Sequence, residues 1–132
     1  MDRLFLDANV LFSAAYRQGA GLLRFWNLKN VTLCSSHYAL EEARINLSDD
    51  AQRGRLEKLA RKIQLFDSTA HQLPSAISLP EKDRPILLAA MAARTTHLIT
   101  GDLRHLGPYF GKKIEGILVV TPSQYLRTYE PH

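Results

Sequence analysis

The stretch Arg3-Leu-Phe-Leu-Asp-Ala-Asn-Val-Leu-Phe-Ser13 sets the fold of this chain. Residues 4–6 form a continuous apolar run, which is typical of a strand that is covered on both faces in a parallel sheet. Asp7 follows this strand directly. Ligands of open α/β sheets bind beyond the carboxyl ends of the strands, so Asp7 suits a ligand site. It equally suits the N-cap of the helix that follows, and the stretch alone leaves both interpretations open.

The composition indicates a globular protein with an anionic partner. The 132 residues predict a single domain, and contents of 45% hydrophobic and 23% charged residues fit a soluble protein. The net charge of +4 and a pI near 9.4 favour nucleic acid as the partner, although solvated helix faces would also account for the basic residues. The single cysteine, Cys34, excludes an internal disulfide. With no membrane-spanning stretch or signal peptide in the sequence, we expect a cytoplasmic protein without membrane contact.

Hydrophobic periodicity predicts strands that alternate with helices. The expected strands cover residues 4–6, 31–34, 97–100 and 117–120, with a short candidate at 64–67. The expected helices follow Asp7 and cover residues 22–28, 36–47, 50–65, 86–93 and 122–127, and a polar connection covers residues 68–80. We find no tight hairpin signal. A parallel sheet with helices on both faces is therefore predicted.

Two of these helices carry distinctive side chains. The helix at 36–47 has an imperfect apolar stripe made of Tyr38, Leu40, Ala43, Ile45 and Leu47. The helix that begins at residue 50 is strongly basic. Its cations form either a solvated face or a surface for RNA or another partner, and they are Arg53, Arg55, Lys58, Arg61 and Lys62.

Four acids are predicted to reach the same end of the sheet. Asp7 and Asp102 follow strands, Asp83 begins a helix, and Glu42 lies in the first turns of another helix. Clustered carboxylates are costly unless a cation neutralises them or some are protonated. Mg²⁺ or Mn²⁺ prefers carboxylate and water oxygens and can activate water at a phosphodiester. No His or Cys pattern in the sequence indicates a competing transition-metal site.

Four motifs together resemble those of a PIN domain, in the same order and over nearly the whole chain. They are Asp7-Ala-Asn9-Val-Leu with Ser13-Ala, Leu40-Glu-Glu42-Ala-Arg-Ile-Asn46-Leu, Lys82-Asp83-Arg-Pro-Ile-Leu-Leu88 and Leu98-Ile-Thr100-Gly-Asp102. The overall form resembles the toxin nucleases of the VapC kind. The resemblance implies a three-layer α/β/α fold with a central parallel sheet. It also implies a metal-dependent endoribonuclease that cleaves RNA through metal-activated water, and a cognate antitoxin protein as partner.

The resemblance assigns roles to individual residues. Asp7, Glu42, Asp83 and Asp102 become the catalytic metal ligands for Mg²⁺ or Mn²⁺. Two polar neighbours, Asn9 and Thr100, would orient ligands or water. Glu41 becomes a solvent-facing neighbour of Glu42, because adjacent helical residues project about 100° apart.

Some relatives carry a further acid shortly after the position of Asp102, where this chain has Leu103-Arg104-His105. Arg104 and His105 are interpreted either as phosphate contacts or as helix-surface residues. A homodimer is a further arrangement that we consider. The alternative functions are a non-catalytic Mg²⁺-binding α/β regulatory module and an RNA-processing nuclease without a toxin role. A haloacid-dehalogenase-like phosphatase is disfavoured because Asn9 stands where that class has a second Asp.

Overall fold

The structure, a computed structural model, describes residues 1–67, 79 and 83–129. Its six-stranded sheet has the order β3-β2-β1-β4-β6-β5. All neighbouring strands in it are parallel except β5 and β6, which are antiparallel. The strands are β1 (Asp2–Leu6), β2 (Val31–Ser35), β3 (Gln64–Leu65), β4 (His97–Ile99), β5 (Lys113–Ile114) and β6 (Ile117–Val120).

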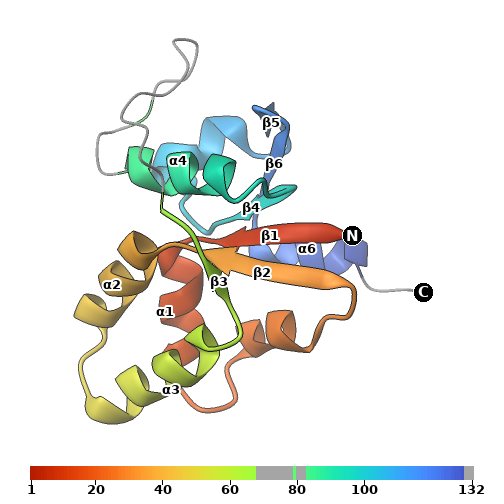
Figure 1. The fold of residues 1–132 in the computed structure, drawn as a ribbon. Helices are drawn as coiled ribbons and strands as arrows, with labels where there is room; N and C mark the ends of the chain where they lie inside the picture. Colours follow the sequence, from red (N-terminus) through yellow and green to blue (C-terminus); the bar gives the residue numbers. More distant parts are fainter. Residues whose placement is uncertain (68–78, 80–82, 130–132) are drawn as a thin grey trace.

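Helices cover both faces of the sheet. In Figure 1, α1, α2 and α3 lie below the strands and α4 lies above them, which confirms the predicted three-layer α/β/α architecture. The α-helices are α1 (Ala8–Tyr16), α2 (His37–Asn46), α3 (Asp50–Ala60), α4 (Arg84–Ala92), α5 (Leu103–Leu106) and α6 (Pro122–Tyr129). Two 3₁₀ helices, η1 (Gly21–Asn27) and η3 (Gly107–Tyr109), complete the described elements. The helix predicted at 22–28 is thus a 3₁₀ helix.

The central strands are buried because helices pack on both sides of them. Leu4, Phe5 and Leu6 of β1 are fully buried, as are Leu98 and Ile99 of β4. This is the environment that the continuous apolar run predicted for a parallel strand. The register pairs Leu6 with Ile99, so the residues that follow β1 and β4 leave the sheet side by side.

The chain ends its sheet with a hairpin that the sequence reading missed. Glu115 and Gly116 form a two-residue loop between β5 and β6, and both have positive φ, at 51° and 81°. A two-residue hairpin turn with both φ angles positive matches the right-handed twist of the strands. Asn and Asp, rather than Glu, are the usual first residues of such turns, so the signal was weak. The prediction that the chain lacks tight hairpins is wrong here.

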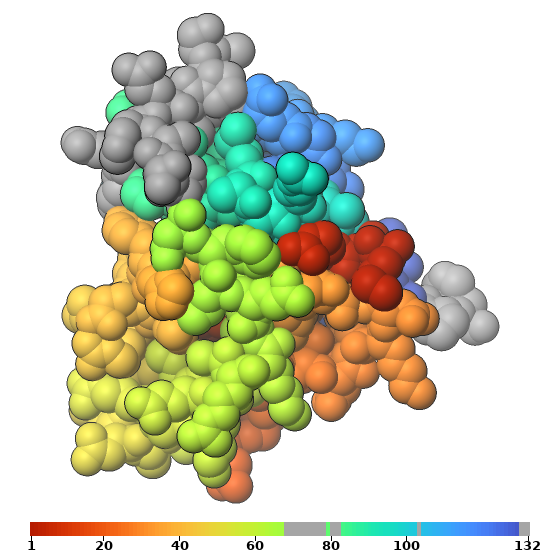
Figure 2. All heavy atoms as spheres, in the orientation of Figure 1, coloured from red at the N-terminus to blue at the C-terminus, as the bar shows by residue number. Residues whose placement is uncertain are grey.

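The basic helix is shorter than predicted. It ends at Ala60 rather than at residue 65, and the chain then forms β3, whose Gln64 pairs with Cys34 of β2. Figure 2 shows the end of α3 and β3, in lime green, on one face of the molecule, and the start of α3 in yellow. Asp49 caps α3 through a capping box with Gln52.

Two arginines of α3 donate hydrogen bonds to the backbone at the ends of α2 and α1. The guanidinium of Arg53 donates to the carbonyl of Leu47, and that of Arg55 donates to the carbonyls of Ala15 and Tyr16. Because these groups satisfy backbone acceptors at helix ends, Arg53 and Arg55 have structural contacts that neither sequence interpretation included.

The apolar stripe predicted for α2 is only partly correct. Ala39, Ala43 and Leu47 are buried, whereas Tyr38 and Ile45 are 41% and 66% exposed. Ser36 caps this helix by accepting a hydrogen bond from the backbone of Ala39. Positions 39, 43 and 47 lie on one helical face, and 38 and 45 lie off it.

Two predictions fall outside the part of the chain that can be compared. The polar connection at 68–80 lies outside the described residues, except for Leu79, and so does Lys82 of the third motif. Among the described residues, no helix combines the length and the apolar character that crossing a membrane requires.

Candidate active site

The pairing of β1 with β4 brings Asp7 next to Thr100. The backbone N–H of Asp7 donates to the carbonyl of Ile99 at 3.0 Å. The Thr100 hydroxyl then donates to Asp7 Oδ2 at 2.8 Å, and both side chains are buried. Asp7 Oδ1 accepts a hydrogen bond from the N–H of Ala8 at 2.7 Å and so caps α1. Asp7 is therefore the N-cap of α1, and its second oxygen joins the polar network beyond the strands.

Asn9 and Thr100 connect the two acid-bearing turns. The Asn9 amide donates to Asp7 Oδ2 and to Thr100 Oγ1, both at 3.3 Å, while Asn9 Oδ1 accepts from the N–H of Gly101 at 2.8 Å. Thr100 Oγ1 also accepts from the N–H of Asp102 at 3.0 Å. These contacts fix the backbone around Asp7 and Asp102 relative to each other.

The two oxygens of Asp102 have different partners. Its Oδ1 accepts hydrogen bonds from the N–H groups of Arg104 and His105, both at 3.1 Å, which caps the short helix α5. Its Oδ2 lies 3.3 Å from Nδ1 of His105. Arg104 is exposed, and the described contact between it and Asp102 is made by the backbone.

His105 lies between two of the acids. Its Nδ1 is 3.0 Å from Asp83 Oδ2, and one ligand atom from each of Asp83, Asp102 and His105 lies within 4.8 Å of the others. The sequence has no pair of histidines at the spacing of metal ligands, so His105 did not stand out as a ligand. Its position three residues after Asp102, in the first turn of α5, is the signal that could have identified it. His105 is a candidate nitrogen ligand that the sequence reading did not include.

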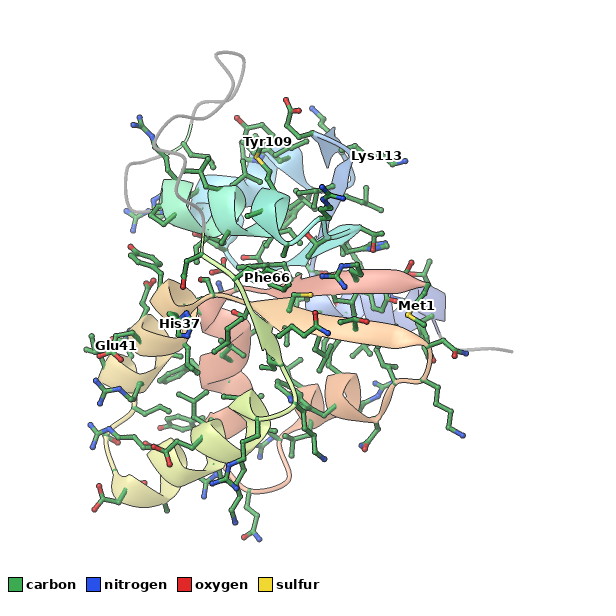
Figure 3. The ribbon with its side chains drawn as sticks, viewed as in Figure 1. Met1, His37, Glu41, Phe66, Tyr109 and Lys113 are labelled. Atoms are coloured by element: carbon green, nitrogen blue, oxygen red, sulfur yellow. The ribbon has the colours of Figure 1, made fainter. Side chains whose placement is uncertain are left out.

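All four predicted acids line one cavity of about 400 Å³, which we call the acid pocket. Its lining residues are Asp7, Ala8, Asn9, Phe12, Glu42, Ala43, Asn46, Asp83, Ile86 and Asp102. Glu42 reaches the pocket from α2. Glu41 instead pairs with Arg44 on the surface, and Figure 3 shows it on the outer side of α2. The structure thus places Glu42 in the pocket and Glu41 outside it.

The pocket makes ionisation of Asp7 unfavourable. Burial, with smaller contributions from the negative charges of Glu42 and Asp102, raises the pKa of the Asp7 carboxyl from 3.8 to about 6. Hydrogen bonds from Thr100 and from the backbone of Ala8 oppose this change in pKa. A buried carboxyl whose pKa lies near neutrality, beside other acids, is typical of a functional site.

Tyr38 is a second residue near the pocket that the sequence reading missed. Partial burial raises the pKa of its phenol, and the charges of Glu42, Asp83 and Asp7 add to this effect. The reading assigned Tyr38 to the apolar stripe of α2, but its ring is 41% exposed. Its place in the first turn of the helix that carries Glu42 could have indicated its proximity to the acids.

The donor set fits a divalent cation. Carboxylate oxygens are preferred by Mg²⁺ and Mn²⁺, and an imidazole nitrogen such as that of His105 is better suited to Mn²⁺ than to Mg²⁺. A cation among Asp7, Glu42, Asp83 and Asp102 would offset the like-charge repulsion that contributes to the raised pKa of Asp7. The cavity at the carboxyl ends of β1 and β4 is also where ligands bind in open α/β sheets.

The α/β/α fold, with an acidic pocket at the carboxyl ends of its central strands, places this protein among the α/β proteins whose ligand site lies at that edge of the sheet. A family model described as a PIN domain matches residues 3–104. The chain therefore belongs to the PIN domain family, whose members are generally nucleases. A search of curated proteins found no significant match.

Proposed function

We propose that this protein is a divalent-metal-dependent endoribonuclease. The observation that carries the proposal is the convergence of Asp7, Glu42, Asp83 and Asp102 on one pocket, from four different segments of the chain. Asp7 and Asp102 also cap helices, but capping alone would not require four acids to line the same cavity. Here the raised pKa of Asp7, caused by burial and by neighbouring acids, indicates a site that is short of positive charge.

In this proposal the four acids hold the cation and the network beneath them fixes their positions. When bound, Mg²⁺ or Mn²⁺ would lower the pKa of water and compensate the charge of a phosphodiester. Asn9 and Thr100 restrain Asp7 Oδ2, and Asp102 Oδ1 is restrained by the first turn of α5. Restraining ligands in this way lowers the reorganisation that the reaction would otherwise require.

The biological setting that we propose comes from the motifs of the chain. Their resemblance to toxin nucleases supports a cytoplasmic toxin of a toxin–antitoxin pair, formed as one PIN unit over residues 1–132. A cognate antitoxin could place an Arg or Lys in the acid pocket, where several carboxylates are available for charge-assisted hydrogen bonds. Pairing of two copies of the chain is a further proposal from the same resemblance.

Removing the metal is expected to abolish cleavage. Purified protein in EDTA should leave a labelled RNA intact, and Mg²⁺ or Mn²⁺ should restore cutting, because none of the described residues that line the pocket is a Ser, Thr, Cys or Lys that could replace metal-activated water as the nucleophile. The measurement is the rate of product formation on a gel, with a Ca²⁺ arm that tests for a general ionic effect. Cleavage at the full rate in EDTA would refute the metal mechanism.

Neutralising two neighbouring glutamates should give opposite results. Glu42→Gln is expected to slow cleavage by at least about 100-fold, or about 3 kcal/mol of transition-state stabilisation, because it removes a carboxylate from the pocket. Glu41→Gln should stay within about 2-fold of wild type, since Glu41 makes an exposed pair with Arg44. Single-turnover rates of both variants provide the comparison. Equal losses in the two variants would refute the assignment of Glu42.

A further inference from the structure

The exposed face of α1 carries a row of side chains that leads away from the acid pocket. Asn9, Phe12, Ser13 and Tyr16 recur at the three- and four-residue spacing of one helical face, and Arg17 follows the last residue of α1. We call these five residues the α1 stripe. The opposite face of α1 is buried in the core. From Asn9 to Tyr16 the stripe covers about 10 Å along the helix axis.

Three hollows follow one another along the α1 stripe. The acid pocket includes Asn9 and Phe12, and a second hollow is lined by Phe12, Ser13, Tyr16 and Arg17. A third cavity, of about 730 Å³, shares Ser13 and Arg17 with the second. Because each hollow shares residues with the next, the three hollows are neighbours along α1, and we call this series of hollows the path.

The far end of this path is positively charged. Arg17 of the α1 stripe, Arg24 of η1 and Arg127 of α6 line the third cavity, which we call the arginine pocket, and all three are exposed. None of the described residues that line it is acidic. Three guanidinium groups around one cavity are complementary to the phosphates of a nucleic acid backbone.

The middle of the path is aromatic. The rings of Phe12 and Tyr16 have centroids 5.3 Å apart at an interplanar angle of 42°, and Tyr16 is 51% exposed. An exposed aromatic ring beside a basic groove is the arrangement with which proteins bind single-stranded nucleic acid, since any base can stack on the ring. A base paired in a duplex is not available for such stacking.

We propose that a single strand of RNA follows the α1 stripe, with a base stacked on Tyr16 and phosphates bound in the arginine pocket. This inference rests on the proposed function, because it places the scissile phosphate at the acid pocket. A second copy of the chain would also cover an exposed aromatic side chain. The arginine pocket favours RNA, because burying three arginines against an identical surface would leave like charges together.

The test is binding of a fluorescently labelled 12-nucleotide oligouridine, measured by anisotropy in EDTA over a range of salt concentrations. Arg17→Gln and Arg127→Gln should each weaken binding and reduce the slope of log affinity against log salt by about 0.7. Tyr16→Ala should weaken binding by about 5-fold or more at an unchanged slope, and Tyr16→Phe should bind like wild type. Lys113→Gln is the control, because this exposed cation lies on β5, away from α1 (Figure 3).

Three results would overturn the path. These are wild-type affinity in the Arg17, Arg127 and Tyr16 variants, an equal loss in Lys113→Gln, and a dimer that Tyr16→Ala converts to a monomer in size exclusion with light scattering. Melting curves of each variant verify that it is folded. Because binding is measured without metal, an inactive protein with the expected binding pattern would refute the nuclease and keep the path. An active protein without that pattern would refute the path alone.

Discussion

Asp102→Asn is expected to reduce RNA cleavage by at least about 10³-fold while leaving the metal-free protein as stable as wild type. The rate loss corresponds to about 4 kcal/mol, because the variant removes one of the charges that would hold the cation. Stability is retained because Asn is as good an N-cap as Asp, so its oxygen can still accept from the N–H groups of Arg104 and His105. Neutralising Asp102 also removes one of the charges that raise the pKa of Asp7.

Two control variants separate the capping role of Asp102 from its charge. Asp102→Ala should be as inactive as the Asn variant but less stable by about 1 kcal/mol, since it removes the cap of α5. Asp50→Asn neutralises a fully exposed acid on α3 and should leave cleavage unchanged. Single-turnover rates and thermal melts in EDTA measure both properties. An Asn variant with wild-type activity would remove Asp102 from the proposed metal site.

The acids at strand ends could be predicted because burial and position act together. A continuous apolar run requires cover on both faces, and neighbouring parallel strands end at the same edge, so Asp7 and Asp102 had to leave the sheet near each other. Which oxygen of each carboxylate caps a helix and which one has another partner depends on atomic contacts, so it could not be predicted. Capping and ligand binding therefore appeared as alternatives for Asp7, although its two oxygens have different partners.

Features made by several short or distant segments were not predictable in the same way. The arginine pocket combines Arg17, Arg24 and Arg127, which are far apart in the sequence and stand in no charged run. From the sequence, the run of cations on α3 is a candidate surface for RNA or another partner. In the structure, Arg53 and Arg55 of this run bind backbone carbonyls. Charge counting predicts an anionic partner but does not distinguish the cations that bind backbone carbonyls from those that line a cavity.

Without metal, the Asp7→Asn variant is expected to become more stable relative to the wild type as the pH rises. Burial, with the charges of Glu42 and Asp102, raises the folded-state pKa of Asp7 from 3.8 to about 6. A raised carboxyl pKa means that folding favours the protonated form, so its contribution is fully present below pH 3.8 and is lost as the pH rises through 6. Between pH 4 and pH 8 the wild type should therefore lose about 2.4 kcal/mol relative to the variant, which has no proton to lose.

In Mn²⁺ at pH 8 the wild type should recover about the stability that it loses between pH 4 and pH 8. A ligand that binds only the folded state, at 100 times its Kd, stabilises by about 2.7 kcal/mol. Wild type should gain this amount, and Asp7→Asn, which lacks a charged ligand, should gain little. The readouts are denaturant unfolding curves at pH 4 and pH 8, with EDTA and with Mn²⁺. Comparing each protein with itself across pH cancels the hydrogen bonds that an Asn side chain cannot make with Thr100 and Asn9.

The two shifts together identify Asp7 as a carboxylate that is unfavourable when the protein is empty and favourable when a cation is present. An N-cap exposed to solvent would give neither shift, because its pKa would not be raised and no metal would bind. A buried N-cap without a metal site would give the pH shift alone, since burial is the main cause of the raised pKa. A proton-sharing pair of acids without a metal site would give the pH shift alone. If the wild type shows the pH shift but no stabilisation by Mn²⁺ or Mg²⁺, the acid pocket does not bind these ions. The metal-dependent mechanism would then be wrong, even though the pocket and its buried carboxyl remain.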